Sequence, residues 1–116
     1  MRLDHVQLAI PRGSEEICRG FYCDLLGWRE VEKPPILAAR GGLWFDIGDG
    51  QVHLGVEDDF RPAKKAHPAL IVDDLDALAQ TLQAAGVAVS FDDAIPDVRR
   101  FYAHDPVGNR LEFIQG

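Results

Sequence analysis

The stretches HVQLAI (His5–Ile10) and HPALIV (His67–Val72) decide the fold, because the second repeats the pattern of the first 62 residues further on (67 − 5). In each stretch a histidine opens a short run whose apolar side chains recur at alternate positions, as they do in a strand with one buried face. Each run is followed by a polar break and then by a helical pattern. The sequence therefore indicates an internal repeat of two modules.

One helix is expected in each module, and residues with capping preferences mark its ends. Ser14 is expected to cap the first helix and Gly27 to end it. Asp73 or Asp74 is expected to cap the second, which ends at Gly86. The apolar rows of the first helix are Ile17, Phe21 and Leu25, with Cys18, Tyr22 and Leu26 beside them. The inward face of the second consists of Leu75, Leu78, Ala79 and Leu82.

After each helix the apolar pattern becomes typical of strands. In the first half the expected strands are Trp28–Val31, Leu37–Arg40, Leu43–Ile47 and Gln51–Val56, with a hairpin turn at Gly48–Gly50. In the second half they are Val87–Phe91, Arg99–Ala103 and Arg110–Ile114, with a turn at Asp105–Asn109. The pattern predicts an α+β protein in which a βαβββ module occurs twice. Residues 1–116 are expected to form a single domain, with module one at 1–57, a linker at 58–66 and module two at 67–116.

Composition and charge exclude some classes of function. The 116 residues are 47% hydrophobic, which is sufficient for a core, and they carry 19 acidic and 12 basic side chains for a net charge of −7. That balance argues against a nucleic-acid-binding protein and against attachment to an anionic membrane. No apolar run approaches the ~18 residues of a membrane span, and no signal peptide is recognisable. Cys18 and Cys23 are five residues apart in one expected helix, so we expect reduced thiols and a cytoplasmic protein.

A metal site is indicated by the last strand of each module. The strands QVHLGV (Gln51–Val56) and RLEFIQ (Arg110–Gln115) align so that His53 and Glu112 occupy the same place, 59 residues apart (112 − 53). Alternation puts both on the face opposite the apolar side chains. Three imidazoles and one carboxylate suit zinc, nickel, iron, cobalt or manganese. The predicted ligands of one divalent metal ion are His5, His53, His67 and Glu112.

Other side chains are candidates for holding a substrate. Aromatic rings can line a pocket, although they more often belong to a core, and arginine binds carboxylate or phosphate through two parallel hydrogen bonds. The substrate-binding candidates are Trp44, Arg40, Tyr102, Arg100 and Phe60. The linker cations Arg61, Lys64 and Lys65 are expected to be solvated. Gln7 shares a face with His5 and is a candidate second-layer partner, and His104 is expected to be exposed and outside the metal set.

Three motifs give the chain a family resemblance. LDHV (Leu3–Val6), FYCDLLGW (Phe21–Trp28) and DPVGNRLEF (Asp105–Phe113) resemble the vicinal-oxygen-chelate superfamily, which includes glyoxalases, bleomycin-resistance proteins and dioxygenases. The resemblance covers essentially the whole chain. It implies that the two βαβββ modules curve into a partly open mixed-sheet barrel around a metal ion, usually in a homodimer, with modules that some relatives exchange between subunits.

The resemblance also implies a chemistry in which the metal ion chelates two adjacent oxygens of a small substrate and stabilises the resulting oxyanion or enolate. Glu112 is the candidate catalytic base. Glyoxalase I-like members carry a carboxylate where this chain has His53, which argues against lactoylglutathione lyase activity, whereas a His-His-Glu triad is typical of fosfomycin-modifying relatives. The favoured function is a metal-dependent lyase, isomerase or transferase acting on a small oxygen-rich molecule.

Two alternatives stay open at the level of sequence. One is a non-catalytic antibiotic or small-molecule binding protein of the bleomycin-resistance type, although such relatives usually lack the metal residues. The other is an iron-dependent extradiol-type dioxygenase, which metal identity and oxygen uptake would distinguish.

Overall fold

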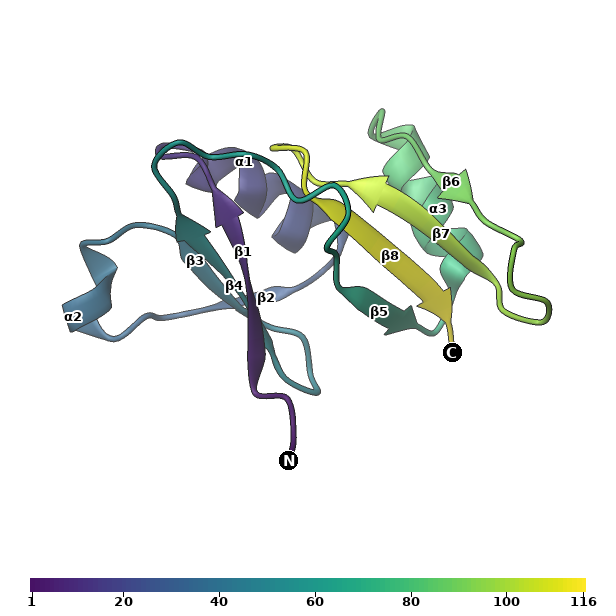
Figure 1. The fold of residues 1–116 in the computed structure, drawn as a ribbon, viewed down its shortest axis with the longest axis horizontal. Helices are drawn as coiled ribbons and strands as arrows, with labels where there is room; N and C mark the ends of the chain where they lie inside the picture. Colours follow the sequence, from purple (N-terminus) through teal and green to yellow (C-terminus); the bar gives the residue numbers. More distant parts are fainter. The chain divides into compact units, whose positions relative to one another are not determined.

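A computed structural model describes residues 1–116, which divide into two compact units, Met1–Ala63 and Lys64–Gly116. Figure 1 shows the strands and helices of each unit. Unit 1 contains β1 (His5–Ile10), α1 (Glu15–Arg19), the π-helix η1 (Gly20–Leu25), β2 (Arg29–Val31), α2 (Pro35–Ala38), β3 (Leu43–Asp46) and β4 (Gln51–Val56). Unit 2 contains β5 (Ala69–Val72), α3 (Leu75–Ala84), β6 (Ser90–Phe91), β7 (Arg100–His104) and β8 (Arg110–Gln115).

Each unit has one mixed sheet with the same topology. The strand orders are β1-β4-β3-β2 and β5-β8-β7-β6. The pairs β1–β4 and β5–β8 are parallel, and the other neighbouring strands are antiparallel. The expected α+β class and the two βαβββ modules are confirmed. The two sheets share no strand, so their strands do not close into a single barrel.

Strand register confirms that the two modules are equivalent. Gln7 pairs with His53 on the parallel strand, and Ala69 pairs in the same way with Glu112. The offsets between these pairs, 62 (69 − 7) and 59 (112 − 53), are those that the sequence repeat predicts. The histidine of module two does not open its strand, however, because β5 begins at Ala69. Pro68 has no N–H for the ladder, but its carbonyl still accepts a hydrogen bond from the Glu112 N–H at 3.1 Å.

The first helix differs from the expected regular α-helix. After Arg19 the backbone widens into η1, where the Leu26 N–H donates to the Phe21 carbonyl five residues earlier at 3.0 Å. Cys18, Phe21 and Tyr22 are buried, whereas Ile17 is 55% exposed, so its predicted place in the apolar row was wrong. Neither Cys18 nor Cys23 is in a disulfide.

Two local predictions in unit 1 also need correction. Ser14 precedes α1 as expected, but its hydroxyl donates to the Pro11 carbonyl instead of accepting from the helix. The predicted strand Leu37–Arg40 does not form: Leu37 and Ala38 end the short helix α2, which stands away from the sheet (Figure 1), and Ala39 and Arg40 form a turn after it. Proline at the first helical position is pre-set for a helix, and it removes a donor that a strand would need.

The apolar face of each sheet forms the core. Alternate residues of the outer and central strands are buried, namely Leu8, Ile10, Val52, Leu54, Leu111 and Phe113. Burial of each such side chain contributes roughly 1.5–3 kcal/mol before the entropy of ordering is counted. In unit 2 the helix α3 is capped by the Asp74 carboxylate, which accepts from the Ala77 N–H at 3.0 Å, and its Leu75, Ala79 and Leu82 are buried.

The turn before β8 is built around one buried carboxylate. Asp105 Oδ1 accepts hydrogen bonds from the backbone N–H groups of Val107 at 3.1 Å and Asn109 at 2.8 Å, and Oδ2 accepts from the Asn109 side chain at 3.2 Å. These bonds confirm the expected turn. They also fix where β8 begins, and therefore where Glu112 lies on its strand.

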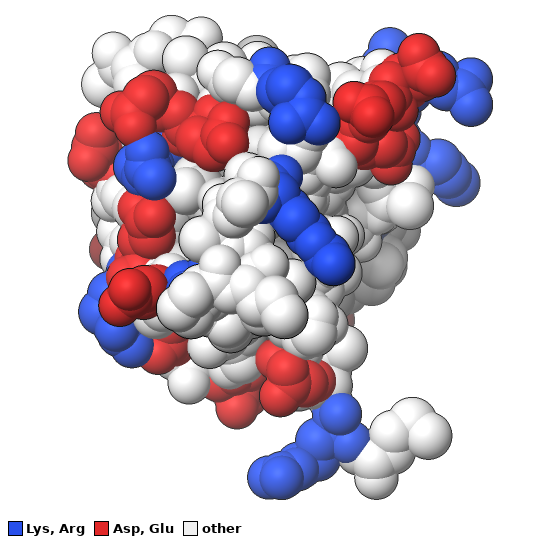
Figure 2. Space-filling view, turned by 90° about the vertical axis from the view of Figure 1, so that its left-hand side faces the viewer, with Lys and Arg blue, Asp and Glu red and all other residues white.

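The surface charge and the lengths of the helices can be compared with what the sequence predicts. On the face drawn in Figure 2, acidic and basic side chains are interspersed and no broad basic area appears. None of the helices combines the length and apolar character that a bilayer-spanning segment needs.

Candidate metal-binding site

In unit 1 the two predicted ligands lie in a column of rings. The His53 ring stacks on Trp44, with centroids 4.0 Å apart and planes 6° apart, because the two residues pair directly across β3 and β4. The His5 ring stacks on the other face of His53 at 4.1 Å and 17°. The sheet therefore brings His5 and His53 together, as the repeat predicts.

Hydrogen bonds orient both imidazoles. His5 Nδ1 lies 2.8 Å from the Asp4 carboxylate, which can only accept, so Nδ1–H donates and Nε2 carries the lone pair of the neutral ring. His53 Nε2 donates to the Gln51 side-chain oxygen at 2.8 Å, so its lone pair is on Nδ1. His53 is only 5% exposed, and burial, assisted by the nearby His5, lowers its pKa below the ordinary 6.5. The neutral form, which can bind a metal ion, is thus favoured.

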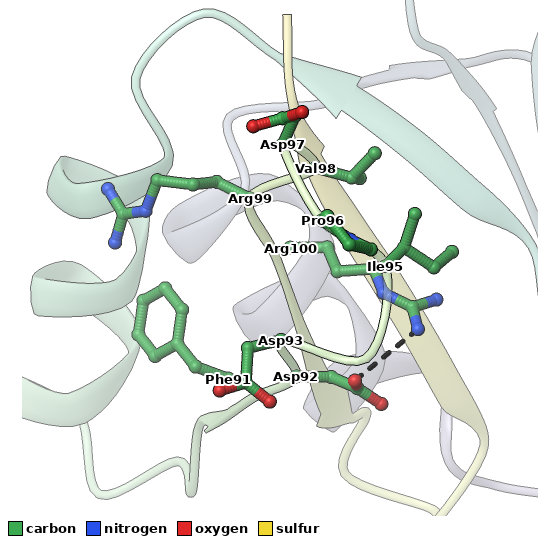
Figure 3. A pocket seen from close by; sticks show the side chains of 9 residues that line it. All are labelled: Phe91, Asp92, Asp93, Ile95, Pro96, Asp97, Val98, Arg99 and Arg100. Atoms are coloured by element: carbon green, nitrogen blue, oxygen red, sulfur yellow. Dashed lines mark ion pairs between the residues drawn. The ribbon is translucent and has the colours of Figure 1, made fainter.

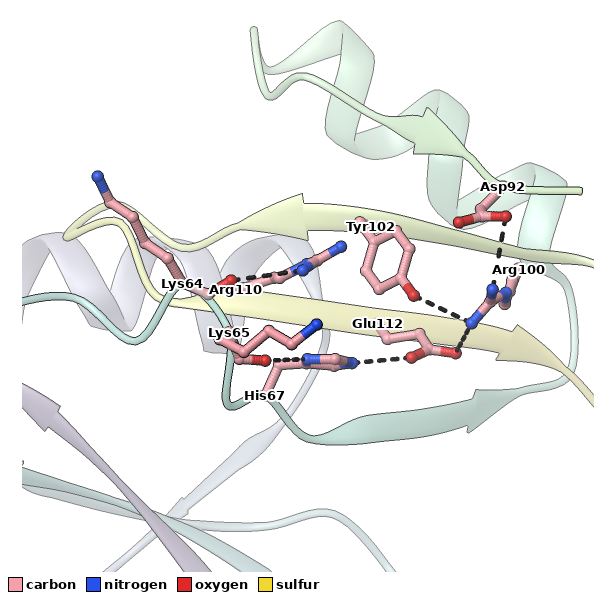
Figure 4. Close-up of polar contacts among 8 residues, drawn as sticks. All are labelled: Lys64, Lys65, His67, Asp92, Arg100, Tyr102, Arg110 and Glu112. Carbon is pink, nitrogen blue, oxygen red and sulfur yellow. Dashed lines mark hydrogen bonds and ion pairs between the residues drawn. The ribbon is translucent and has the colours of Figure 1, made fainter. Parts of the chain in front are cut away.

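In unit 2 the two predicted ligands are in direct contact (Figure 4). His67 Nε2 lies 2.9 Å from Glu112 Oε1, and His67 Nδ1 lies 2.8 Å from the Lys65 carbonyl oxygen. A carbonyl can only accept, so Nδ1 carries a hydrogen. Nε2 then faces the carboxylate either with a second proton or with a lone pair, and a metal cation can take the place of that proton.

The other oxygen of Glu112 is held by Arg100. The Arg100 guanidinium donates to Glu112 Oε2 at 3.1 Å and to the Tyr102 hydroxyl at 3.0 Å, and it pairs with the Asp92 carboxylate at 3.4 Å. Burial raises the pKa of Glu112, but the hydrogen bonds from His67 and Arg100 outweigh it, so the pKa lies below the usual 4.5. Glu112 is therefore an oriented, ionised carboxylate.

The donor set fits a divalent ion in chemistry, and in unit 2 two donor atoms are already close. His67 Nε2 and Glu112 Oε1 are 2.9 Å apart, whereas two tetrahedral ligand atoms, each about 2.1 Å from one ion, lie roughly 3.4 Å apart, so a small separation of the pair admits an ion. In unit 1 the rings of His5 and His53 are stacked, so the lone pairs of their nitrogens lie in two nearly parallel planes and do not converge on one point. One ring must rotate before both can bind the same ion. Within each unit no three histidine, cysteine or carboxylate side chains gather at one point.

The remaining candidates are in different surroundings. Trp44 and Tyr102 occupy equivalent register positions beside His53 and Glu112. Arg40 is exposed at the end of α2 and Phe60 is half-buried after β4, and neither makes an ion pair or ring contact with the predicted ligands. Arg100 also lines a hollow of about 560 Å³ beside the β6–β7 loop, where Asp92 contacts its guanidinium (Figure 3).

The model of the Glyoxalase/Bleomycin resistance protein/Dioxygenase superfamily matches residues 2–113. The chain belongs to this superfamily. Glyoxalase-superfamily proteins generally bind a divalent metal ion and small molecules, and they often act as dimers. No curated protein matches the chain.

Solved structures of the glyoxalase superfamily resemble the whole chain. A protein from Bacillus anthracis assigned to the glyoxalase family is 48% identical, with a TM-score of 0.96 over 100% of this chain and 95% of that one. An antibiotic-binding protein from a Streptomyces species is 28% identical, with a TM-score of 0.71 over 99% and 98% of the chains. A fosfomycin resistance protein from Listeria monocytogenes, at 16% identity and a TM-score of 0.78 over 100% and 93%, shares the fold.

Several residues around the four predicted ligands were not singled out from the sequence. Gln51 orients His53, Asp92 holds Arg100, and the Arg110 guanidinium lies over the Tyr102 ring at 4.0 Å. Alternation along β8 places Arg110 on the same face as Glu112 and could have identified it. The role of Asp92 follows from a loop conformation that has no comparable signal.

Proposed function

We propose that the protein is a divalent-metal-dependent lyase, isomerase or transferase acting on a small oxygen-rich substrate. In this proposal the two modules form one glyoxalase-like domain and the protein is a homodimer. His5, His53, His67 and Glu112 would bind the ion, and this donor set suits zinc, nickel, iron, cobalt and manganese. When bound, such an ion supplies a positive charge that stabilises an oxyanion or enolate.

The observation that carries the proposal is the pair formed by His67 and Glu112. Each has one atom turned to the other at 2.9 Å and a second atom held from behind, His67 by the Lys65 carbonyl and Glu112 by Arg100. Ligands of a metal ion are commonly oriented in this way by outer partners. A histidine and a glutamate serving only as a surface ion pair need no such support, and Glu112 is 7% exposed.

The chain's own groups suit proton transfer next to such a substrate. Glu112 is ionised, so its Oε1, which faces His67, could accept a substrate proton once that oxygen leaves the ion. Arg100 keeps the other oxygen fixed and charged, with Asp92 holding Arg100 in turn. Trp44 and Tyr102 are the proposed ring contacts of the substrate, and Arg40 and Phe60 remain candidates.

Metal content tests this function directly. Protein purified without an affinity tag is analysed by plasma mass spectrometry, beside the variants His5→Ala and Glu112→Gln. His104→Ala is the matched control, because His104 is an exposed histidine outside the proposed set. We expect near-stoichiometric metal in the wild type and in His104→Ala, and loss of metal with reduced turnover in the other two.

Normal metal content in Glu112→Gln would exclude Glu112 as a ligand. Absence of metal from the wild type, even after reconstitution with the five ions, would favour the second candidate, a non-catalytic small-molecule binding protein. The 28% identity to an antibiotic-binding protein over nearly the whole of both chains supports that candidate. Iron together with oxygen uptake would favour an extradiol-type dioxygenase.

A further inference from the structure

Cations without acidic partners gather next to the proposed metal ligands in unit 2. Lys64 and Lys65 lie three and two residues before His67, and Arg110 lies two residues before Glu112 on β8. None of the three forms an ion pair, although the chain has seven more acidic than basic side chains. In Figure 4, Lys65 and Arg110 extend along the face that carries His67 and Glu112, whereas Lys64 points away.

Arg110 is held in place with most of its donors unused. Its guanidinium lies 4.0 Å from the centre of the Tyr102 ring, and its one hydrogen bond is a long one, 3.4 Å, to the Lys64 carbonyl. Tyr102 is itself fixed, because its hydroxyl accepts from Arg100 and its ring meets the His67 ring edge-on at 5.5 Å. A stacked guanidinium keeps its N–H edge available for a planar or tetrahedral oxygen group.

Arg100 is not available for the same task. Its guanidinium already contacts two carboxylates, Glu112 and Asp92, as well as the Tyr102 hydroxyl. To bind a substrate anion it would have to release Glu112, which is the proposed ligand and base. The two arginines on this face therefore differ in role: Arg100 positions Glu112, and Arg110 has free binding capacity.

We propose that the substrate carries an anionic oxygen group, a carboxylate or a phosphoryl group, which binds to the Arg110 guanidinium with the Lys65 ammonium beside it. This inference rests on the proposed function, because the remaining substrate oxygens would then face His67 and Glu112. Arg110 becomes a residue that determines substrate specificity. Tyr102 supports it as a stacking surface.

The test is isothermal titration calorimetry at low ionic strength with two probes, inorganic phosphate and oxalate. The full chain is titrated after treatment with a chelator and again after loading with zinc. The variants are Arg110→Gln, Arg110→Lys and Lys65→Gln. Arg99→Gln is the matched control, because it removes the same charge from unit 2 at a guanidinium that is bound to Asp76 on α3.

We expect the wild type and Arg99→Gln to bind at least one probe equally well, with and without zinc. Arg110→Gln should weaken that binding about tenfold or more, and Lys65→Gln by a smaller factor. Arg110→Lys separates the two chemistries: a lysine still binds phosphate as a point charge, but it loses the paired hydrogen bonds that favour a carboxylate. Thermal unfolding confirms that each variant is folded.

Equal binding by the wild type and Arg110→Gln, or no binding of either probe by the wild type, would overturn the inference. If zinc still binds at the four ligands when the anion site fails this test, the proposed metal-dependent function stands and only the anion site is excluded. If both probes depend on Arg110 but no metal binds, the anion site is supported and the metal-dependent function fails.

Discussion

The strands β4 and β8 occupy the same place in the two modules but serve different chemistry. His53 and Glu112 are matched in register, and each faces an aromatic ring on the neighbouring strand, Trp44 or Tyr102. Around His53 the neighbours are rings and an amide, and burial favours the neutral imidazole. Around Glu112 the neighbours are an arginine and a histidine, and the carboxylate is held in its ionised form.

The difference between the surroundings of His53 and Glu112 comes from the residue two positions before Trp44 or Tyr102. In module one this position is Gly42, where an added Cβ would lie 2.1 Å from the Leu54 carbonyl oxygen. In module two it is Arg100, whose side chain reaches Glu112. The repeat thus preserves strand register and the buried face, while the open face of each sheet is determined by the space and charge available locally.

The largest effect on stability is expected from Gly42→Ala, which places a Cβ where the Leu54 carbonyl leaves no room for one. Gly42 has φ +87°, so the alanine would be both strained and in contact with backbone that cannot move aside. We expect a loss of about 3 kcal/mol in the free energy of unfolding, measured with urea. Gly86→Ala is the control, since its φ of +83° is similar but nothing lies within 4 Å, and it should lose only about 1 kcal/mol. Equal losses would show that the Leu54 carbonyl does not restrict the site.

A smaller effect is expected from Glu112→Gln in the metal-free protein. Because the pKa of Glu112 is lower in the folded state than its usual 4.5, ionisation stabilises the fold above that pH, and this stabilisation is lost as the pH falls through the folded pKa. The variant should be less stable by about 2 kcal/mol at pH 7, and the difference should shrink in acid. Urea unfolding from pH 7 to pH 3 measures it. A difference that is constant with pH would contradict the charged pairing with His67 and Arg100.

The smallest effect concerns the titration of His53, followed by NMR. Its pKa should lie below 6.5, so the folded state binds fewer protons than the unfolded chain, and this group favours unfolding as the pH falls below 6.5. His5→Ala should raise the pKa of His53 and Asp4→Asn should lower it further, because His5 disfavours and Asp4 favours the imidazolium. If both variants shift the pKa of His53 in the same direction, the charges of His5 and Asp4 do not determine that pKa.

Much of the backbone was predictable because a buried face leaves a periodic signal. The matched strands, the α3 cap and the Asp105 turn follow from alternation and from residue types with strong local preferences. The helix α2 was mistaken for a strand because Leu37–Arg40 is too short to show a period. Pro35 was the better guide. The π-helix η1 was not predictable, since an α-helical period and a slightly wider one differ little over six residues.

The candidate site could be proposed from the sequence as a set of residue types but not as a set of partners. His53 and Glu112 follow from the repeat, and the side chains of His5 and His67, each two residues before their register partners Gln7 and Ala69, contact them. The bond from Arg100 to Glu112 could not be derived, because it needs both the register of β7 and β8 and the direction of a long side chain. Arg110 was overlooked because a cation beside a turn is usually solvated.

The parallel pairing of first and last strands sets the order in which each module is completed during synthesis. His5 pairs with a residue 46 positions later (51 − 5), and Ala69 with one 43 positions later (112 − 69). At about 5–20 residues per second, β1 leaves the ribosome about 2–9 s before its partner strand exists. Closing such long loops also makes folding slower than pairing neighbouring hairpins. The strands that carry His53 and Glu112 are therefore the ones whose arrival allows each half of the nascent chain to fold.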